Sequence, residues 1–350
     1  HEAYLMTPFK TACLGAGYFA QFHLEAWARA EQAELVAIAD QDLQKAGKAG
    51  AFGASAFANL DDMLATCEID ILDIIVPPTQ HAAAIQTAID HKIPHVICQK
   101  PFCGTLAQAT EMTSRAEAAG IHLIVHENFR FQPWFQTLKE QLETGILGDV
   151  YQMRFTLRPN DGRGPDAYLS RQPYFQKMPR FLVHETAIHF LDVFTYLFGL
   201  PEEIYADLSQ RNPALAGEDS GHILLGFKDG KRALFDGNRL ADHIAENHRL
   251  TMGDGLIEGS GGALRLNGFG EVFYRANGVV EEVCLLANRD WPGFGGDCVF
   301  NLISHIISRL QVGKMPVNSA REYLTLLALE EQVYNSAEQG RKLPFSPLGS

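Results

Sequence analysis

Polar residues that could do chemistry stand out in the segment HETAIHFLDVFTYLFG, residues 184–199, which is otherwise almost entirely apolar. On an α-helix, with 100° per residue, Glu185, His189, Asp192 and Tyr196 fall within an arc of about 60°, and apolar side chains fill much of the remaining circumference. A helix that is apolar nearly all round is expected to be buried. Its polar stripe must therefore face a cleft, a ligand or a matched network of polar groups.

The spacing of Glu185 and His189 suits proton transfer. A carboxylate four residues before a histidine on a helix can orient the imidazole, and imidazoles exchange protons near neutral pH. We predict that His189 and Glu185 are catalytic and contact the substrate, while Asp192 braces His189 or the junction between domains. The alternative is a satisfied core histidine with acids that cap the helix. His184 fits the arc less well and is expected only to line the pocket.

A second reactive group is Lys100, which follows the apolar segment HVICQ and precedes Pro101. If HVICQ is a parallel strand, Lys100 lies at its carboxyl end, where open α/β sheets bind ligands. An ammonium group there can hold an alcohol oxygen and accept its proton when hydride leaves the carbon. We predict that Lys100 is catalytic and contacts both substrate and cofactor. The alternative is an exposed loop lysine.

A glycine-rich turn supplies a nucleotide site. Gly15, Ala16, Gly17, Tyr18, Phe19 and Ala20 form a G-x-G-x-x-A motif between an expected strand and an expected helix. The first glycine allows a tight turn, and the second lets the backbone approach a pyrophosphate. Asp40 ends the next expected strand, where an acid can hold the ribose hydroxyl groups of adenosine. No arginine follows to accept a 2′-phosphate, so NAD is favoured over NADP. An ordinary glycine-rich turn and a solvated acid are the alternatives.

The elements that must position these residues fall into two groups. Up to about residue 126, short apolar runs alternate with helical patterns, which predicts a Rossmann domain, a doubly wound parallel sheet wrapped by helices. Residues 127–350 are predicted to form a substrate-binding α/β domain with a large, mostly antiparallel open sheet. The expected strands there lie within 150–158 and 203–287, and helices are expected near 133–145, 296–311 and 319–339. The polar stretch 159–180 is a long loop, which is typical of a functional segment.

Composition excludes several classes of protein. The 350 residues carry a net charge of −13 without a basic block, which disfavours nucleic acid and anionic membrane surfaces as partners. The six cysteines show no metal-ligand spacing, so we expect no metal site and reduced thiols in a cytoplasm. We see no apolar run of membrane-spanning length and no secretory signal in the sequence.

Several of these segments together resemble the Gfo/Idh/MocA-type oxidoreductases over nearly the whole chain. The resemblance rests on the Gly15–Ala20 turn, the segment VPPTQH at 76–81, the tripeptide Gln99-Lys100-Pro101 and the Glu185, His189, Asp192 spacing. It implies a nucleotide domain joined to an α/β domain whose open sheet serves in oligomer contacts. The tripeptide is Glu-Lys-Pro in the family, so Gln99 stands in the place of an acid. Glu185 stands where the family commonly has Asp.

The resemblance also implies further contacts. The turn that carries Pro77, Pro78 and His81 passes the nicotinamide in the family. Capping of the next helix is the simpler role for this turn. The resemblance also places Gln99 in the cofactor site. Asn128 and Arg130 follow the last strand of the nucleotide domain, where an amide could hold the nicotinamide carboxamide or the substrate. A linker role is equally open for both. Arg163 and Tyr174, in the 159–180 loop, are expected to bind substrate, and other polar side chains of the loop are expected to be solvated.

We therefore expect an NAD-dependent dehydrogenase that acts on CH-OH groups of a small sugar. The resemblance implies sugars and cyclic polyols, and the first expectation is an aldose such as D-apiose, oxidised at C1 to the lactone. A cyclic polyol of the inositol type is the alternative substrate. A non-catalytic NAD-dependent sensor, or a glycosidase or lyase that uses NAD transiently, are the alternative functions. A homodimer or homotetramer is expected.

Overall fold

The computed structural model describes residues 7–347, so the expectation about a signal at the N-terminus falls mainly outside them. Contacts divide the chain into two units. Unit 1 comprises the residues up to Glu127 together with Val299–Leu324, and unit 2 comprises Asn128–Cys298 together with the residues from Thr325 onward. The predicted change of domain near residue 126 stays a prediction, and residues 299–324 are grouped by their contacts with unit 1.

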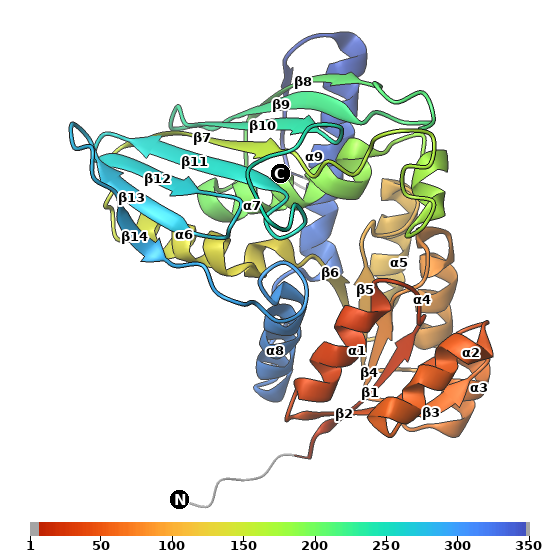
Figure 1. The fold of residues 1–350 in the computed structure, drawn as a ribbon. Helices are drawn as coiled ribbons and strands as arrows, with labels where there is room; N and C mark the ends of the chain where they lie inside the picture. The colour runs from red at the N-terminus through yellow and green to blue at the C-terminus, as the bar shows by residue number, and fades with distance from the viewer. Residues whose placement is uncertain (1–6, 348–350) are drawn as a thin grey trace, which may run out of the picture. The chain divides into compact units, whose positions relative to one another are not determined.

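Unit 1 contains a six-stranded sheet in the order β3-β2-β1-β4-β5-β6, with every pair of neighbours parallel (Figure 1). The predicted doubly wound sheet is thereby confirmed. Its strands are β1 Phe9–Leu14, β2 Ala33–Ala39, β3 Ser55–Phe57, β4 Ile71–Ile74, β5 His95–Gln99 and β6 His122–His126. Its helices are α1 Ala20–Arg29, α2 Leu43–Ala46, α3 Leu60–Thr66, α4 His81–Asp90 and α5 Leu106–Ala118, and most of α8 Cys298–Gln311 belongs here too.

Parallel pairing brings the carboxyl ends of these strands to a common edge. The residues that follow β1, β2 and β5 are Gly15, Asp40 and Lys100, three of the predicted site residues. β4 is buried at every position, as a central parallel strand should be. The strand pattern therefore gathers chemically distinct side chains at the edge where α/β sheets bind ligands.

Unit 2 contains a nine-stranded sheet in the order β14-β13-β12-β11-β7-β10-β9-β8-β15. Among the described strands of this sheet, only β7 and β10 pair in parallel, so the predicted mostly antiparallel sheet is confirmed. The strands are β7 Val150–Leu157, β8 Glu203–Ser209, β9 Ser220–Gly226, β10 Arg232–Asn238, β11 Gly253–Gly259, β12 Gly262–Leu266, β13 Val272–Ala276, β14 Val283–Leu286 and β15 Leu343–Pro344. The helices are α6 Pro133–Glu143, α7 Ile188–Phe198 and part of α9 Ala320–Gln339.

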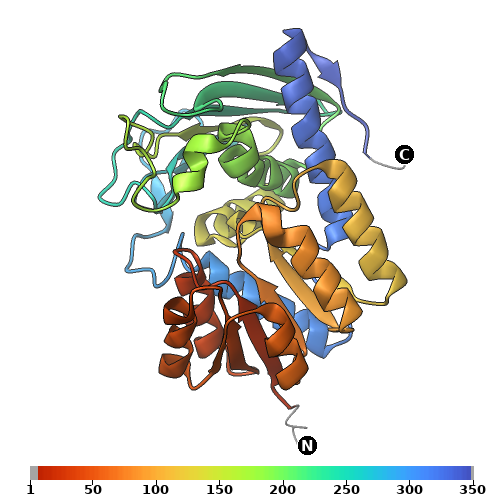
Figure 2. The same cartoon turned by 90° about the vertical axis from the view of Figure 1, so that its right-hand side faces the viewer.

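One face of this sheet is covered by α7 and α6 (Figure 2). Along β7, Met153, Phe155 and Leu157 are buried, alternating with more exposed positions. The ring of Phe155 stacks on Phe190 of α7 at a centroid distance of 4.1 Å. The core of unit 2 thus fixes the position of α7, which carries the polar stripe found in the sequence.

Two features of unit 2 differ from expectation. The central strand β11 was not predicted, because its sequence GDGLIEG has glycine at three of its inward positions. A Cβ at Gly253 would lie 1.9 Å from the carbonyl oxygen of Thr156, so the close approach to β7 requires glycine there. The expected single helix over 184–199 is instead a π-helix, Leu182–Ala187, followed by α7.

In the part of the chain between residues 7 and 347, the model contains no helix with the length and hydropathy needed to cross a membrane.

The fold generates a prediction about acid stability through His95. Burial, and then repulsion from His122, lower the pKa of His95 to about 4, and the two ring Nδ1 atoms lie 3.1 Å apart. An unfolded histidine has a pKa of about 6.5. Between these values the unfolded chain binds a proton that the native chain does not, so stability must fall as pH drops from about 6.5 to about 4.

The folded protein should therefore lose about 2 kcal/mol of unfolding free energy at this residue between pH 7.5 and pH 5.0. His95→Gln should remove most of that loss, as measured by urea unfolding at both pH values. His91→Gln, an exposed position of unit 1, is the matched control and should keep the wild-type loss. An unchanged pH dependence in His95→Gln would contradict the prediction.

Candidate active site

The turn after β1 has the shape that a pyrophosphate requires. Gly15 has a φ of +104°, and a Cβ there would lie 2.8 Å from the carbonyl oxygen of Ile75. A Cβ at Gly17 would meet no atom within 4 Å, so the space above this residue is open. The first glycine thus serves the tight turn and the second leaves room for a ligand, as predicted for a dinucleotide. The Tyr18 residue is 41% exposed. The ring centroids of Phe19 and Phe22 lie 5.3 Å apart.

Asp40 is tied to this turn. Its Oδ2 accepts a hydrogen bond of 2.8 Å from the backbone N–H of Ala16, and its Oδ1 accepts one of 2.8 Å from the backbone N–H of Asp42. A carboxylate oxygen has a second lone pair, so each can still accept a ribose hydroxyl. The Nζ of Lys48 lies 3.4 Å from the carbonyl oxygen of Ala16. The residues present therefore fit a dinucleotide whose ribose carries free hydroxyl groups.

The turn after β4 is held from inside by His81. This ring is fully buried, and its nitrogens lie 2.8 Å from the carbonyl oxygen of Val76 and 3.0 Å from that of Pro101. Burial lowers the pKa of His81. The ring therefore joins the turn to the segment after β5, while Pro77 is exposed and Pro78 begins a short 3₁₀ helix.

Lys100 lies directly after β5 and is partly exposed. Its backbone N–H donates a hydrogen bond of 3.0 Å to Oε1 of Gln99, and the peptide bond to Pro101 is cis. The Gln99 side chain is only 7% exposed and also contacts His23 and His126 inside the sheet. The contact with His23 could not be predicted from the sequence, because α1 and β5 are far apart along the chain.

The π-helix changes the geometry of the predicted polar stripe. Upstream of Ile188, the residues do not follow the 100° spacing of an α-helix, so the arc calculated for Glu185 does not apply to it. The carboxylate of Glu185 instead accepts hydrogen bonds from the Thr186 hydroxyl and from Arg239, whose Nη1 lies 3.4 Å away. A π-turn is a common feature of functional sites.

His189 and Asp192 lie on α7 itself. The His189 ring is 5% exposed and stacks on Phe129 at 3.8 Å with an interplanar angle of 2°, so its plane is fixed. Asp192 accepts two hydrogen bonds from Arg130, from Nε at 2.8 Å and from Nη2 at 2.5 Å. The Arg130 guanidinium also lies 5.2 Å from the Tyr196 ring. Asp192 thus joins α7 to the start of unit 2, and its expected role in bracing His189 or the domain junction stays a prediction.

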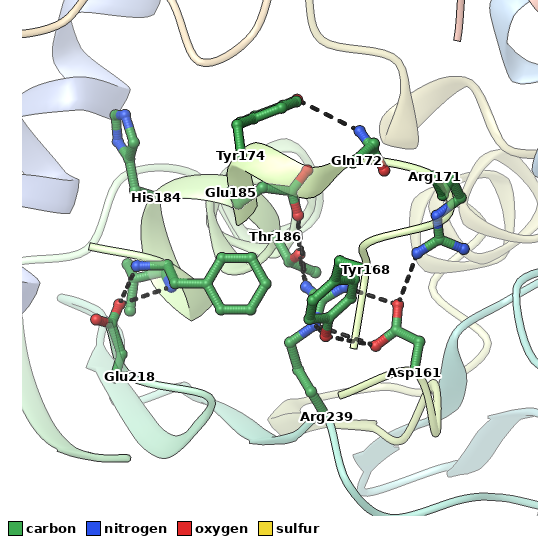
Figure 3. Close-up of polar contacts among 12 residues, drawn as sticks. Asp161, Tyr168, Arg171, Gln172, Tyr174, His184, Glu185, Thr186, Glu218 and Arg239 are labelled. Atoms are coloured by element: carbon green, nitrogen blue, oxygen red, sulfur yellow. Dashed lines mark hydrogen bonds and ion pairs between the residues drawn. The ribbon is translucent and has the colours of Figure 1, made fainter. Parts of the chain in front are cut away.

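Arg239, at the end of β10, is the centre of the charged cluster in Figure 3. It is 1% exposed. Its Nε and Nη2 donate to the two carboxylate oxygens of Asp161 at 3.2 and 2.9 Å, and Nε also donates to the Tyr168 hydroxyl at 2.6 Å. Its Nη1 donates to Thr186 and Glu185. One guanidinium therefore links the loop after β7 to the π-helix.

The charges of this cluster stabilise one another. Burial alone would raise the pKa of Asp161, but the nearby Arg239 and hydrogen bonds hold it below its usual value. Burial would conversely deprotonate Arg239, yet Asp161, Tyr168 and Glu185 raise its pKa. The cluster is therefore ionised, with guanidinium and carboxylate groups matched.

The 159–180 loop is packed and not merely solvated. Ala167, Tyr168, Phe175, Phe181 and Leu215 form a small hydrophobic core beneath it. Tyr174 and Gln172 lie above the π-helix in Figure 3, and the Gln172 amide donates to the Tyr174 hydroxyl at 3.3 Å. Burial, and then the charge of Glu185, raise the pKa of Tyr174. Arg163 is exposed, and its Nε donates to the Leu240 carbonyl oxygen at 2.5 Å.

Asn128 carries an unused acceptor. The residue is 2% exposed, and its Oδ1 is buried without a hydrogen-bond partner among the described residues. Buried polar atoms are normally paired, so this oxygen fits the predicted role of holding an amide or hydroxyl group of a ligand. Within residues 7–347, no group of three or more potential metal-ligating acids, histidines or cysteines was found.

Comparison with known proteins identifies the family of both parts of the chain. Residues 9–127 match the model of the oxidoreductase family with an NAD-binding Rossmann fold, and residues 135–255 match the GFO/IDH/MocA C-terminal domain. The D-apiose dehydrogenase of Paraburkholderia graminis is 33% identical over 347 residues, which cover 97% of this chain and 90% of that protein. The D-apiose dehydrogenase of Rhizobium rhizogenes is 32% identical over 98% of this chain and 99% of its own length.

A solved structure gives the same result. The oxidoreductase of Agrobacterium radiobacter, solved in complex with NAD+, L-tartaric acid and magnesium, is 30% identical and has a TM-score of 0.85. The match covers 97% of this chain and 98% of that one. The expected family and the expected cofactor NAD are confirmed. The chain belongs to the Gfo/Idh/MocA family of oxidoreductases and is an NAD-dependent dehydrogenase acting on CH-OH groups.

Proposed function

We propose that this dehydrogenase oxidises a neutral sugar, with an aldose such as D-apiose as the substrate and C1 as the carbon that is oxidised to the lactone. The observation that carries the proposal is the charge balance around Arg239. In this cluster Arg239 and Arg171 face Asp161 and Glu185, two cations against two anions. The names of the two D-apiose dehydrogenases that are 33% and 32% identical support the choice of sugar.

The matched charges disfavour an anionic substrate. Arg130 is paired with Asp192 at 2.5 Å, and Arg158 is paired with Asp236 at 2.7 Å. A phosphate or carboxylate group would have to displace one of these carboxylates from its guanidinium. Truncating or displacing one partner of a partly buried ion pair leaves an uncompensated charge, which is costly. Hydroxyl groups, by contrast, can share the lone pairs that the carboxylates still have.

The proposed chemistry divides between the cofactor and the chain. Bound NAD supplies the hydride acceptor. Gly15, Gly17 and Asp40 would hold its pyrophosphate and ribose, and Asn128 would hold its carboxamide or the substrate. Lys100 would bind the hydroxyl that reacts and accept its proton.

His189, whose ring plane is held by stacking on Phe129, would exchange a proton with the substrate. Glu185 would accept a hydrogen bond from a substrate hydroxyl, because Arg239 and Thr186 hold its carboxylate in place. Tyr174, whose pKa burial raises, would remain a phenol that donates hydrogen bonds. Proton removal and hydride loss from one CH-OH group together give the carbonyl of the product.

One assay of NAD reduction can test both the proposed sugar substrate and the proposed role of Lys100 as proton acceptor. We expect NAD reduction, followed at 340 nm, with D-apiose or another free aldose, and at most weak reduction with sugar phosphates and sugar acids. Lys100→Met should lower kcat with the best substrate by at least about a hundredfold, since general base catalysis contributes about 10²–10⁴. The control is Lys45→Met, at an exposed lysine of α2 that lies 4.0 Å from Asp42, and it should keep wild-type turnover.

Two results would contradict this proposal. The first is NADH formation only with phosphorylated or acidic sugars. The second is wild-type kcat in Lys100→Met. Faster NADH formation with inositols than with any aldose would instead select the cyclic polyol as the substrate.

The role of Arg239 gives a further prediction. Arg239→Met leaves Asp161 and Glu185 without their shared cation, so kcat/KM and stability should both fall, the latter by about 3 kcal/mol. Arg239→Lys keeps the charge but cannot donate to both acids with the same geometry, so it should lie between wild type and Arg239→Met. Arg232→Met, at the exposed start of the same strand, should match wild type. Equal kcat/KM in all four proteins would refute a role for the cluster in substrate binding.

We also propose that the chain forms a homodimer or homotetramer through the open face of the nine-stranded sheet. Tyr205 and Leu224 are cross-strand neighbours that remain 39% and 37% exposed, and Leu234 pairs with Leu224 on the next strand.

Light scattering coupled to size exclusion should give a dimer or tetramer mass. Leu224→Lys should shift it toward the monomer, whereas Lys228→Ala, in the exposed turn after β9, should not. A monomer mass for the wild type would contradict the assembly.

A further inference from the structure

Unit 1 contains a buried polar chain that ends at the backbone of Lys100. Asp73 of β4, His23 of α1 and Gln99 of β5 are 0%, 0% and 7% exposed. These three residues, which we call the Gln99 relay, lie on three elements of the same unit. The sequence did not suggest any connection among them.

The contacts run in one line. His23 Nδ1 lies 2.7 Å from Asp73 Oδ2, which also accepts a hydrogen bond of 2.8 Å from the Trp27 indole N–H. His23 Nε2 lies 2.8 Å from the Gln99 side-chain nitrogen. The Gln99 side-chain oxygen accepts the backbone N–H of Lys100 at 3.0 Å. Asp73 is thereby connected to the reactive segment through two side chains.

The positions of the protons in the relay follow from the backbone N–H of Lys100, which can only donate a hydrogen bond. The backbone N–H of Lys100 is a donor, so the Gln99 atom that faces it must be the amide oxygen. The other amide atom is then the NH₂ group, which donates to His23 Nε2. His23 Nε2 is therefore an acceptor, and the ring proton is on Nδ1, where Asp73 accepts it.

We propose that Gln99 is a positioning residue for Lys100, and that the Asp73–His23 pair fixes the orientation of its amide. The inference rests on the role proposed above for Lys100. Every donor in the relay faces an acceptor, so rotating the amide of Gln99 would break the contacts with His23 and with Lys100 together. The relay therefore sets the path of the backbone that carries the Lys100 side chain.

The relay also accounts for an amide in a place where the family has an acid. A carboxylate at position 99 could still accept the backbone N–H of Lys100. Its second oxygen would, however, face the lone pair of His23 Nε2, leaving two acceptors together in a buried site. Protonation of His23 would relieve this only by placing an imidazolium between two carboxylates. In this chain, residue 99 must therefore supply a hydrogen-bond donor to His23, and the glutamine amide does so.

The orientation of the relay can be tested in the wild-type enzyme. Neutron diffraction from crystals of the full chain locates hydrogen on nitrogen directly. We expect hydrogen on His23 Nδ1, none on His23 Nε2, and the Gln99 NH₂ group oriented with one hydrogen toward His23 Nε2 and the other toward His126 Nδ1. Hydrogen on His23 Nε2 would overturn the proposal, whatever the behaviour of any variant.

Kinetics test whether the relay acts through Lys100. Gln99→Glu should lower kcat at least about tenfold while the Kd for NAD changes less than about threefold, because the defect concerns the reactive segment and not the pyrophosphate turn. Gln32→Glu, an exposed position of the same unit before β2, is the matched control and should change neither. The double variant Gln99→Glu/Lys100→Met should have the residual kcat of Lys100→Met alone, since effects through one group do not add.

Two kinetic outcomes would refute the relay: wild-type kcat in Gln99→Glu, or a double variant that loses the full product of both single effects. The second would mean that Gln99 supports the fold without acting through Lys100. Wild-type turnover by Lys100→Met alone would instead refute the role proposed for the lysine. The single variants therefore separate failure of the relay from failure of the proposed function.

Discussion

A charge buried in a protein must be matched by partners within hydrogen-bond distance, and the interior of each unit is arranged around one such group. In unit 2 the group is the Arg239 guanidinium, which is 1% exposed and donates to Asp161, Tyr168, Thr186 and Glu185. In unit 1 it is the Asp73 carboxylate. Burial would raise the pKa of Asp73, but its contacts with His23, His126 and Trp27 hold it below the usual value. Because each group needs partners from several elements, each also fixes the segments that carry reactive side chains.

The sequence predicted the nucleotide unit well because its signals are local. Gly15, Asp40 and Lys100 each directly follow an apolar strand, and parallel pairing then brings the strand ends to one edge. β11 was missed because three of the four inward positions in GDGLIEG are glycine, so the segment lacks the alternation of apolar side chains that reveals a strand; Gly253 is needed for close pairing with β7. Hydrophobic periodicity is a pattern of apolar side chains. A strand whose inward positions are mostly glycine has few such side chains, so its sequence does not show the period of two that predicts a strand.

The site in unit 2 was predicted only in part. The apolar pattern over 184–199 correctly indicated a buried segment, but it was interpreted with the spacing of an α-helix, and the π-helix Leu182–Ala187 breaks that spacing. The charged partner of Glu185 could not be found in the sequence, since Arg239 is 54 residues away, directly after β10. The same holds for His23 and Asp73, which are separated by 50 residues. Charged networks of this kind form between elements, so only the fold reveals them.

The two departures from the family pattern have a common explanation. Gln99 stands where the family has an acid, and its neighbour His23 presents a lone pair that requires a donor. Glu185 stands where the family commonly has Asp, and it lies in a π-helix from which its carboxylate contacts Arg239 and Thr186. In both cases the functional group at the reactive position suits a buried partner contributed by another element. A substitution toward the family residue would therefore change the contact with that partner as well, so the effects of changing the position and its partner are not expected to add.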